Sequence, residues 1–344
     1  MAREFDLLIK NGRVLDGTGS PFIKADIGVK NVKIAKIGKF NGNAIKTIDA
    51  KNQIVSPGFI DLHSHSDLTL LVDGEAQSKI RQGVTTEILG ESGSVAPVLG
   101  PAAEGFDHGL HPMGIQRDWT TLGEYFARAK RQGISVNIAS YVGTGQVRYC
   151  VIGNYNRPPT AGELDQMQKL VEQAMQDGAI GVSSGLVYPP NSYAKTDEIV
   201  ELSKIAAKHG GIYATHIRSE SDTSLAAIDE AIEIGEQGGL PVHIFHFKKY
   251  GQKHWGRMQE QLDRIQAARD RGVDITADQY PYIAAMTGLE MCIPPKFMEG
   301  TAKEFVARLK DPQVRMARRG RAILDATHNR QSTGAAAGAV RRSR

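Results

Sequence analysis

The sequence predicts an α/β protein: a (β/α)8-type TIM barrel in which seven strands are evident and the eighth is missing, preceded by a small N-terminal β domain. From residue 54 onward, apolar strand-like runs alternate with amphipathic segments, which is the pattern of a parallel sheet covered by helices. From the fourth run onward the pattern repeats about every thirty residues, the usual length of one βα unit. A chain of 344 residues has room for a single barrel of about 250 residues and a satellite domain.

The N-terminal segment is typical of short strands joined by turns. Apolar or alternating runs lie at residues 5–9, 14–15, 26–29 and 34–38, and Gly, Asn and Asp separate them. We therefore expect a small β domain over residues 1–53, an incomplete barrel over 54–310 and a separate tail over 311–344.

The barrel strands are placed by apolar runs that each lead into a polar cluster. They are expected at residues 53–61, 84–89, 135–141, 179–183, 211–215, 241–245 and 273–277. Three helices are predicted from a Thr followed three residues later by Glu, the spacing of a capping box; these pairs begin at Thr121, Thr160 and Thr301. An eighth strand is expected after the last of these helices.

The tail, residues 311–344, does not have the pattern of that strand. It holds eight arginines against Asp311 and Asp325, followed by a Gly- and Ala-rich run with little to bury. We expect it to be disordered and to result from a truncation or frameshift after about residue 310. Its positive charge exceeds the +4 of the whole chain, so the remainder is slightly acidic and offers no basic surface for nucleic acid.

Composition is that of an ordinary globular protein, with 41% hydrophobic and 23% charged residues. The apolar runs are only strand-sized and the N-terminus has no signal-peptide core, so a cytoplasmic protein without a membrane span is expected. Two cysteines, Cys150 and Cys292, are too few for a disulfide framework and are interpreted as packing residues.

A His-x-His motif marks the end of the first barrel strand, in the run PGFIDLHSH at residues 57–65. Residues two apart on a strand point to the same side, so His63 and His65 can meet one metal ion in the mouth of the barrel. Neutral imidazole is a common ligand for Zn²⁺ and its neighbours in the first transition series.

Further candidate ligands end later strands. His216 follows the fifth strand and His246 the sixth, and the C-terminal ends of barrel strands are where barrel active sites form. His243 lies with Phe245 on the strand face opposite His246 and is expected to be structural. Glu91 follows the second strand, where a carboxylate can bind or bridge metal ions; a solvated loop position is the alternative.

Together with the run RQGVTT at residues 81–86 and the run SSGLVYPP at 183–190, these motifs resemble the N-acyl-D-amino-acid deacylase (D-aminoacylase) branch of the amidohydrolase superfamily. The likeness spans about residues 5–310. Dihydroorotases and hydantoinases share the His-x-His element, whereas the second run and the spacing to the later histidines point more narrowly to the deacylases.

The resemblance implies a metal centre that holds zinc, as one or two divalent ions. Its ligands would be His63, His65, His216 and His246. The family has a Cys on the second strand where this chain has Ser92, preceded by Glu91. Serine is a poor replacement for a thiolate, so Glu91 is interpreted as the compensating metal ligand.

The resemblance also implies substrate-binding residues. Lys248 and Tyr280 match the positions of the family's binders of the substrate carboxylate, a role that suits a cation and a phenol. Arg148 is the third candidate, at the end of the loop GTGQVR at residues 143–148. That loop resembles a family loop with His at the position of Thr144, so substrate preference is expected to differ.

The implied reaction is hydrolysis of the amide of an N-acyl-D-amino acid, or a related small amide, by a metal-activated water. In the family a proton-handling Asp lies in a Ser-Asp-Gly segment on the eighth strand. No such segment follows residue 283, so the catalytic residue stays unassigned. Two alternatives are open: an inactive metal-binding fragment, and a cyclic amidase similar to hydantoinases and dihydroorotases. The expected partner is a small-molecule amide, not nucleic acid or membrane, and no oligomeric state is predicted.

Overall fold

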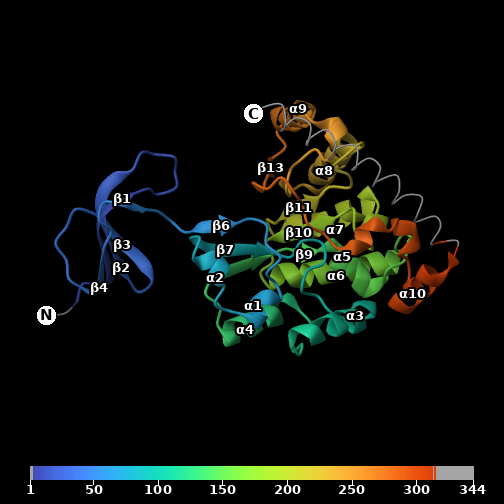
Figure 1. The fold of residues 1–344 in the computed structure, drawn as a ribbon, viewed down its shortest axis with the longest axis horizontal. Coiled ribbons are helices and arrows are strands. Elements are labelled where there is room, and N and C mark those ends of the chain that lie inside the picture. The colour runs from blue at the N-terminus through green and yellow to red at the C-terminus, as the bar shows by residue number, and fades with distance from the viewer. Residues whose placement is uncertain (1–2, 313, 315–344) are drawn as a thin grey trace, which may run out of the picture. The chain divides into compact units, whose positions relative to one another are not determined.

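The computed structural model describes residues 3–312 and 314, and these divide into two compact units (Figure 1). One unit holds residues 3–59 with Gly83–Thr85, and the other holds residues 60–82 and those from Thr86 onward. The tail expected over residues 311–344 lies outside the described residues, apart from positions 311, 312 and 314. The domain boundary expected at residue 53 stays a prediction.

The first unit is built on a five-stranded sheet. Strand β1 (Phe5–Val14) pairs antiparallel with β2 (Ile23–Lys30) and parallel with β4 (Ala44–Asp49). The strand β3 (Lys33–Gly38) pairs with β2, and β5 (Ile54–Val55) pairs with the end of β1. Buried Val14, Ala25 and Ile27 form its small apolar core.

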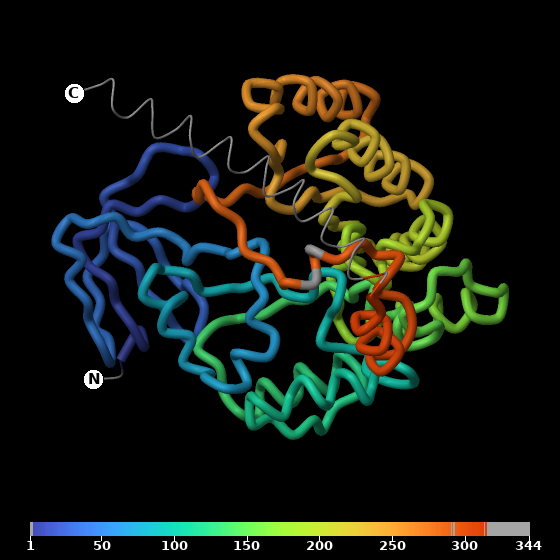
Figure 2. Tube along the Cα trace, turned by 45° about the vertical axis from the view of Figure 1, so that its right-hand side comes forward, coloured from blue at the N-terminus to red at the C-terminus, as the bar shows by residue number. Residues whose placement is uncertain are grey.

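The barrel strands follow one another in a parallel series, which the tube in Figure 2 traces from blue to orange. Strand β6 (Phe59–Asp61) neighbours β7 (Val84–Leu89), which pairs parallel with β8 (Asn137–Ser140). After Tyr141 the chain continues as β9 (Val142–Gly143), which begins a second parallel run. That run continues through β10 (Gly181–Gly185), β11 (Ile212–His216), β12 (Val242–Ile244) and β13 (Ile275–Ala277). The predicted α/β fold with a barrel-type parallel sheet is confirmed.

The first predicted barrel strand, residues 53–61, is wrong in extent. Ile54–Val55 pairs with β1 of the small sheet, and only Phe59–Asp61 joins the barrel series. Pro57 lies between the two segments, and because proline has no N–H to donate, it interrupts strand pairing. The other six predicted strands are found with shifts of a few residues at their ends.

Helices connect the barrel strands. The predicted capping boxes are present at the starts of α4 (Leu122–Gln132), α6 (Ala161–Gln176) and α10 (Ala302–Lys310). Helix α6 packs on α7 (Thr196–Lys208), α7 on α8 (Ser224–Gly238), and α8 on α9 (Met258–Asp270), as Figure 1 shows. The other helices are α1 (Thr69–Val72), α2 (Gln77–Ile80), α3 (Pro101–Leu110), α5 (Thr144–Val151), η1 (His111–Met113), η2 (Asn191–Tyr193), η3 (Gln252–His254), η4 (Leu289–Cys292) and η5 (Pro295–Phe297). In the part of the chain that the structure describes, no helix has the length and apolarity to cross a membrane.

Successive side chains along a barrel strand point to opposite faces of the sheet and pack in two different apolar clusters. On β11, Tyr213 joins the large cluster between sheet and helices, whereas Ala214 packs with Tyr141 and Phe245 in a separate inner cluster. His216 lies two residues beyond Ala214 on the same strand, so it continues the inner face toward the C-terminal end of the barrel. This alternation aims the strand-end residues at the barrel mouth.

Candidate metal centre

His63 and His65 lie in the loop that leaves β6. The N–H of Ser64, between them, donates to the carbonyl of Ile88 on β7 at 2.9 Å, so the loop is still bound to the next strand where it presents the two rings. His63 Nε2 lies 2.5 Å from Glu91 Oε2, and His65 Nε2 lies 3.0 Å from the same oxygen. The structure thus brings both histidines of the motif to the Glu91 carboxylate.

Glu91 is carried by a tight loop after β7. Gly90 has a φ of +89°, and a Cβ there would lie 2.3 Å from the carbonyl oxygen of Tyr141, so only glycine fits. Ser92 is also left-handed, with a φ of +52°, and its N–H donates to Ser183 Oγ at 2.9 Å. These backbone constraints fix the direction in which Glu91 leaves the strand.

Asn191 links this loop to the start of α5. It is buried, and its Oδ1 accepts hydrogen bonds from the Gly185 N–H at 2.8 Å and from Ser92 Oγ at 3.3 Å. Its Nδ2 donates to Thr144 Oγ1 at 3.1 Å. Ser92 and Thr144 stand where the resembled family has Cys and His, so one amide bonds both positions at which this chain departs from the family pattern.

His216 and His246 complete the cluster from the other side. Phe245 directly follows β12 and lies in the inner cluster, so continued alternation would turn the next side chain outward. The backbone of His246 is instead left-handed, with a φ of +39°, and its ring lies 4.4 Å from the ring of His216 in an edge-to-face arrangement. The turn at His246 therefore brings its imidazole into the site.

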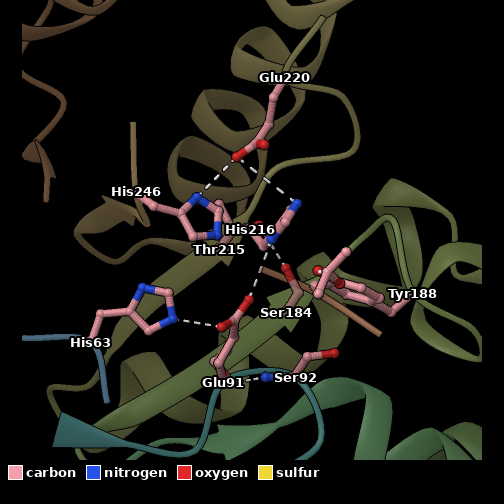
Figure 3. Close-up of polar contacts among 12 residues, drawn as sticks. His63, Glu91, Ser92, Ser184, Tyr188, Thr215, His216, Glu220 and His246 are labelled. Carbon is pink, nitrogen blue, oxygen red and sulfur yellow. Dashed lines mark hydrogen bonds and ion pairs between the residues drawn. The ribbon is translucent and has the colours of Figure 1, made fainter. Parts of the chain in front are cut away.

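Glu91 is shared by two sets of donor atoms, as Figure 3 shows in part. In each set, the donor atoms lie within 4.8 Å of one another; the sets are His63, His65 and Glu91, and Glu91, His216 and His246. His216 Nδ1 lies 3.5 Å from Glu91 Oε1, the oxygen opposite the one that His63 contacts. Burial raises the pKa of the Glu91 carboxyl, but hydrogen bonds with His216, His63 and His65 outweigh burial and hold the pKa far below its ordinary value.

Lys248 and Tyr280 lie beside this cluster. The carboxylate of Glu220, which was not predicted from the sequence, contacts both Lys248 and His246. Lys248 Nζ lies 5.4 Å from the centre of the Tyr280 ring and 2.5 Å from Glu220 Oε1. Glu220 Oε1 also lies 2.9 Å from His246 Nδ1. A signal for Glu220 was present, because it follows His216 by four residues at the C-terminal edge of the sheet, where polar residues gather.

Asp278 is a second missed acid, and it directly follows β13. Its Oδ1 accepts from the backbone N–H of His246 at 2.6 Å, and its Oδ2 lies 3.0 Å from His243 Nε2 and 4.0 Å from His63 Nδ1. The other ring nitrogen of His243 lies 2.8 Å from Thr276 Oγ1. Asp278 therefore ties the end of β13 to the left-handed turn that presents His246.

Arg148, predicted to bind substrate, is fully buried in α5 instead. Its guanidinium donates to Glu198 Oε2 at 2.5 Å and to the carbonyl oxygens of Tyr155 at 3.1 Å and Arg157 at 2.5 Å. These contacts use the charge of Arg148 to join α5, α7 and the loop between α5 and α6. The substrate-binding prediction for Arg148 is replaced by a structural role.

A cavity of ≈ 500 Å³ opens beside the donor atoms. His65, Glu91, His216 and His246 line one part of its wall. Elsewhere, among the described residues, its wall is neutral and combines small polar groups with aromatic and apolar side chains, including Tyr149, Asn154, Tyr188, Pro190, Met286 and Thr287. The cavity thus has a charged end, rich in imidazole, and a neutral remainder.

The fold and this cluster define a class of protein: the chain belongs to the amidohydrolase family, whose sequence profile matches residues 46–332. Within that family it is similar to D-aminoacylase of Alcaligenes xylosoxydans xylosoxydans, with 39% identity over 291 residues that cover 84% of this chain and 60% of that protein. It is 34% identical to N-acyl-D-glutamate deacylase of the same organism, and the matched region covers 83% of this chain and 59% of that protein. The chain therefore spans about three fifths of the length of these relatives.

Solved structures give the same result. The crystal structure of N-acyl-D-glutamate deacylase from Bordetella bronchiseptica, complexed with zinc and a phosphonate inhibitor, matches with a TM-score of 0.75 and 35% identity, covering 81% of this chain and 59% of that one. A structure of D-aminoacylase, described by its binuclear metal centre, matches with a TM-score of 0.73 and 36% identity at the same coverage. The predicted resemblance to the deacylases is confirmed.

Proposed function

We propose that this protein is a metal-dependent amidohydrolase that cleaves the amide bond of N-acyl-D-amino acids or related small amides. The observation that carries the proposal is one carboxylate, Glu91, whose side chain is 6% exposed and is contacted by imidazoles at the ends of two different barrel strands. The similar D-aminoacylase, and the similar deacylase structure complexed with zinc, support this substrate class and this metal.

The donor atoms fit zinc. Imidazole nitrogens and carboxylate oxygens are ligands that Zn²⁺ accepts, and the two donor sets share Glu91. We infer that the chain holds one or two divalent ions, with Glu91 as the shared ligand. A bound ion would lower the pKa of a water molecule and polarise the substrate carbonyl.

Lys248 and Tyr280 are proposed to bind the substrate carboxylate. Lys248 Nζ lies 3.0 Å from His246 Nδ1, so a carboxylate held by this ammonium would lie next to the donor cluster. The phenol of Tyr280 supplies a neutral hydrogen-bond donor next to it. The two residues would hold one end of the substrate and direct its amide toward Glu91 and the histidines.

Metal content measured together with amine release tests the proposal. The purified chain is dialysed against zinc, bound metal is counted by mass spectrometry, and amine release from N-acetyl-D-methionine and its L-enantiomer is followed with ninhydrin. We expect bound zinc and turnover of the D-substrate, both lost in His216→Ala. His209→Ala is the matched control, because His209 is an exposed histidine paired with Glu172 at 2.8 Å.

The outcomes separate the alternatives. Zinc bound without turnover would support an inactive metal-binding fragment. Faster hydrolysis of hydantoin or dihydrouracil than of the acyclic amide would support a cyclic amidase. A wild-type chain that binds no zinc, or a His216→Ala variant that binds it equally well, would overturn the proposal.

A further inference from the structure

Glu220 occupies a position behind the donor cluster that no ligand role explains. It lies in the loop between β11 and α8, and its side chain is 15% exposed. Its Oε1 lies 2.9 Å from His246 Nδ1, 3.9 Å from His216 Nε2 and 2.5 Å from Lys248 Nζ. Figure 3 shows Glu220 on one side of the two rings and Glu91 on the other.

The contact with Glu220 selects a tautomer of His246. A neutral imidazole carries one N–H, and an ionised carboxylate can only accept a hydrogen bond. Because Glu220 faces Nδ1, the ring proton is favoured on Nδ1, and Nε2 keeps the lone pair that a metal requires. In Figure 3 the second ring nitrogen of His246 is turned away from Glu220, toward the side of Glu91.

His216 presents its nitrogens in the opposite order. Its Nε2 faces Glu220, at 3.9 Å, and its Nδ1 faces Glu91 Oε1, at 3.5 Å. One carboxylate therefore lies on the far side of both rings relative to Glu91. At His246 it favours a free lone pair on Nε2, whereas at His216 it lies beyond hydrogen-bonding distance and acts through its charge alone.

Lys248 would act against this arrangement if Glu220 were absent. Its ammonium lies 3.0 Å from His246 Nδ1 and can only donate, which would favour a lone pair on Nδ1 and a proton on Nε2. Glu220 Oε1 lies 2.5 Å from that ammonium and thereby holds it as an ion pair. The carboxylate thus contacts both the Lys248 ammonium and His246 Nδ1, and it offers the ring proton an acceptor that the ammonium cannot supply.

From these contacts we infer that Glu220 is a positioning residue of the metal centre: it sets which nitrogen His246 presents to the metal and holds the Lys248 ammonium. The inference rests on the metal centre proposed above. Carboxylates that orient metal-bound histidines in this way typically change metal affinity by about 10–100-fold when they are replaced.

Metal affinity of Glu220→Gln, measured by chelator competition with the full chain, tests the inference. We expect the ion held by Glu91, His216 and His246 to bind about 10–100-fold more weakly, and the ion held by the His63 set to be unchanged. Glu230→Gln is the matched control. Glu230 lies on the adjoining helix α8, its side chain is 13% exposed, and its Oε1 lies 2.8 Å from Arg218 Nη2. Replacing it should leave the affinities for both ions unchanged.

Imidazole ¹⁵N NMR of the metal-free chain gives a readout independent of metal and turnover. We expect the Nδ1–H tautomer of His246 in the wild type and a shift toward the other tautomer in Glu220→Gln, with Glu220→Asp restoring it in part. Equal metal affinity and an unchanged tautomer in Glu220→Gln would overturn the inference and leave the proposed function standing. Failure of both variants to fold would also overturn it, since Glu220 would then act on stability. Absence of zinc from the wild type would instead remove the proposed function itself.

Discussion

Glu91 is the residue on which both donor sets depend, so it should be the most sensitive position in the site. Glu91→Gln keeps the shape but removes the charge, and we expect a fall in zinc affinity of at least about 100-fold, beyond the loss typical of an outer carboxylate. Ser92→Ala should retain zinc, because the Ser92 hydroxyl bonds to Asn191. The number of zinc ions per chain, measured for each variant, shows whether Glu91 or Ser92 binds the metal. Loss of metal in Ser92→Ala but not in Glu91→Gln would show that Ser92 is the ligand.

Arg148 should matter for stability rather than for catalysis. Arg148→Met leaves Glu198, 5% exposed, without its partner in the interior, and breaking a buried pair in this way costs about 3–5 kcal/mol of unfolding free energy. Urea denaturation measures that loss. The Michaelis constant of the folded fraction should be unchanged, and a large rise in it with normal stability would restore Arg148 as a substrate-binding residue.

The candidate ligands could be predicted from the sequence because each one ends or follows an apolar strand run. The supporting acids lie at similar positions, but their roles could not be predicted. Glu220 and Asp278 act through contacts with residues on other strands, and those contacts depend on how each loop folds back. Arg148 shows the opposite error. A motif placed it near the site, but the turn of α5 on which it lies faces Glu198 in the interior.

Helices and strands could be predicted where residues close in the sequence determine them. Capping boxes form at the three Thr–Glu pairs from which helices were predicted, and six of the seven barrel strands lie at the predicted apolar runs. Residues 53–61 were predicted as one strand because apolar residues lie on both sides of Pro57. The segment before the proline instead pairs with the small sheet, and the segment after it pairs with the barrel sheet. Which sheet a short strand joins depends on partners far away in the sequence.

Helix α6 provides a pH-dependent test at this scale. Hydrogen bonds from the Arg157 guanidinium and the Thr160 N–H lower the pKa of Glu163 from 4.5 to about 2. Because the folded pKa is the lower one, this carboxylate stabilises the fold above about pH 4.5, and the stabilisation is lost as the pH falls toward 2. Glu163→Gln should therefore lower the urea midpoint at neutral pH and have less effect near pH 3.5. An effect that is equal at both pH values would contradict the assignment, and Glu201→Gln, in an exposed pair on α7, is the control.

At the scale of the whole molecule, zinc should stabilise the fold, because the donor atoms follow β6, β7, β11 and β12 and come together only when these strands are assembled. At about 100 times its dissociation constant, a ligand of the folded state contributes about 2.7 kcal/mol. A thermal melt with zinc should shift upward, with magnesium as the control because it prefers oxygen ligands. An identical melt with zinc and with chelator would count against the site.

The cavity also predicts a preference among substrates. Away from the donor cluster its described wall is neutral and includes Tyr149, Tyr188 and Met286, so a charged substrate side chain would lose water without gaining a partner. We expect kcat/KM for N-acetyl-D-methionine to exceed that for N-acetyl-D-glutamate by at least about tenfold, which corresponds to about 1.4 kcal/mol. Equal or reversed values, measured by amine release, would show that a cation reaches the side-chain end of the cavity.

The amide of Asn191 makes positions 92 and 144 epistatic. Its oxygen accepts from Ser92 and its nitrogen donates to Thr144, and Thr144 is 1% exposed. Replacing Thr144 alone by the larger histidine of the resembled family would have to displace that amide, and replacing Ser92 alone by cysteine would give it a weaker donor. The two hydroxyls therefore depend on each other through one amide, and we expect an exchange at one position to be tolerated only together with an exchange at the other.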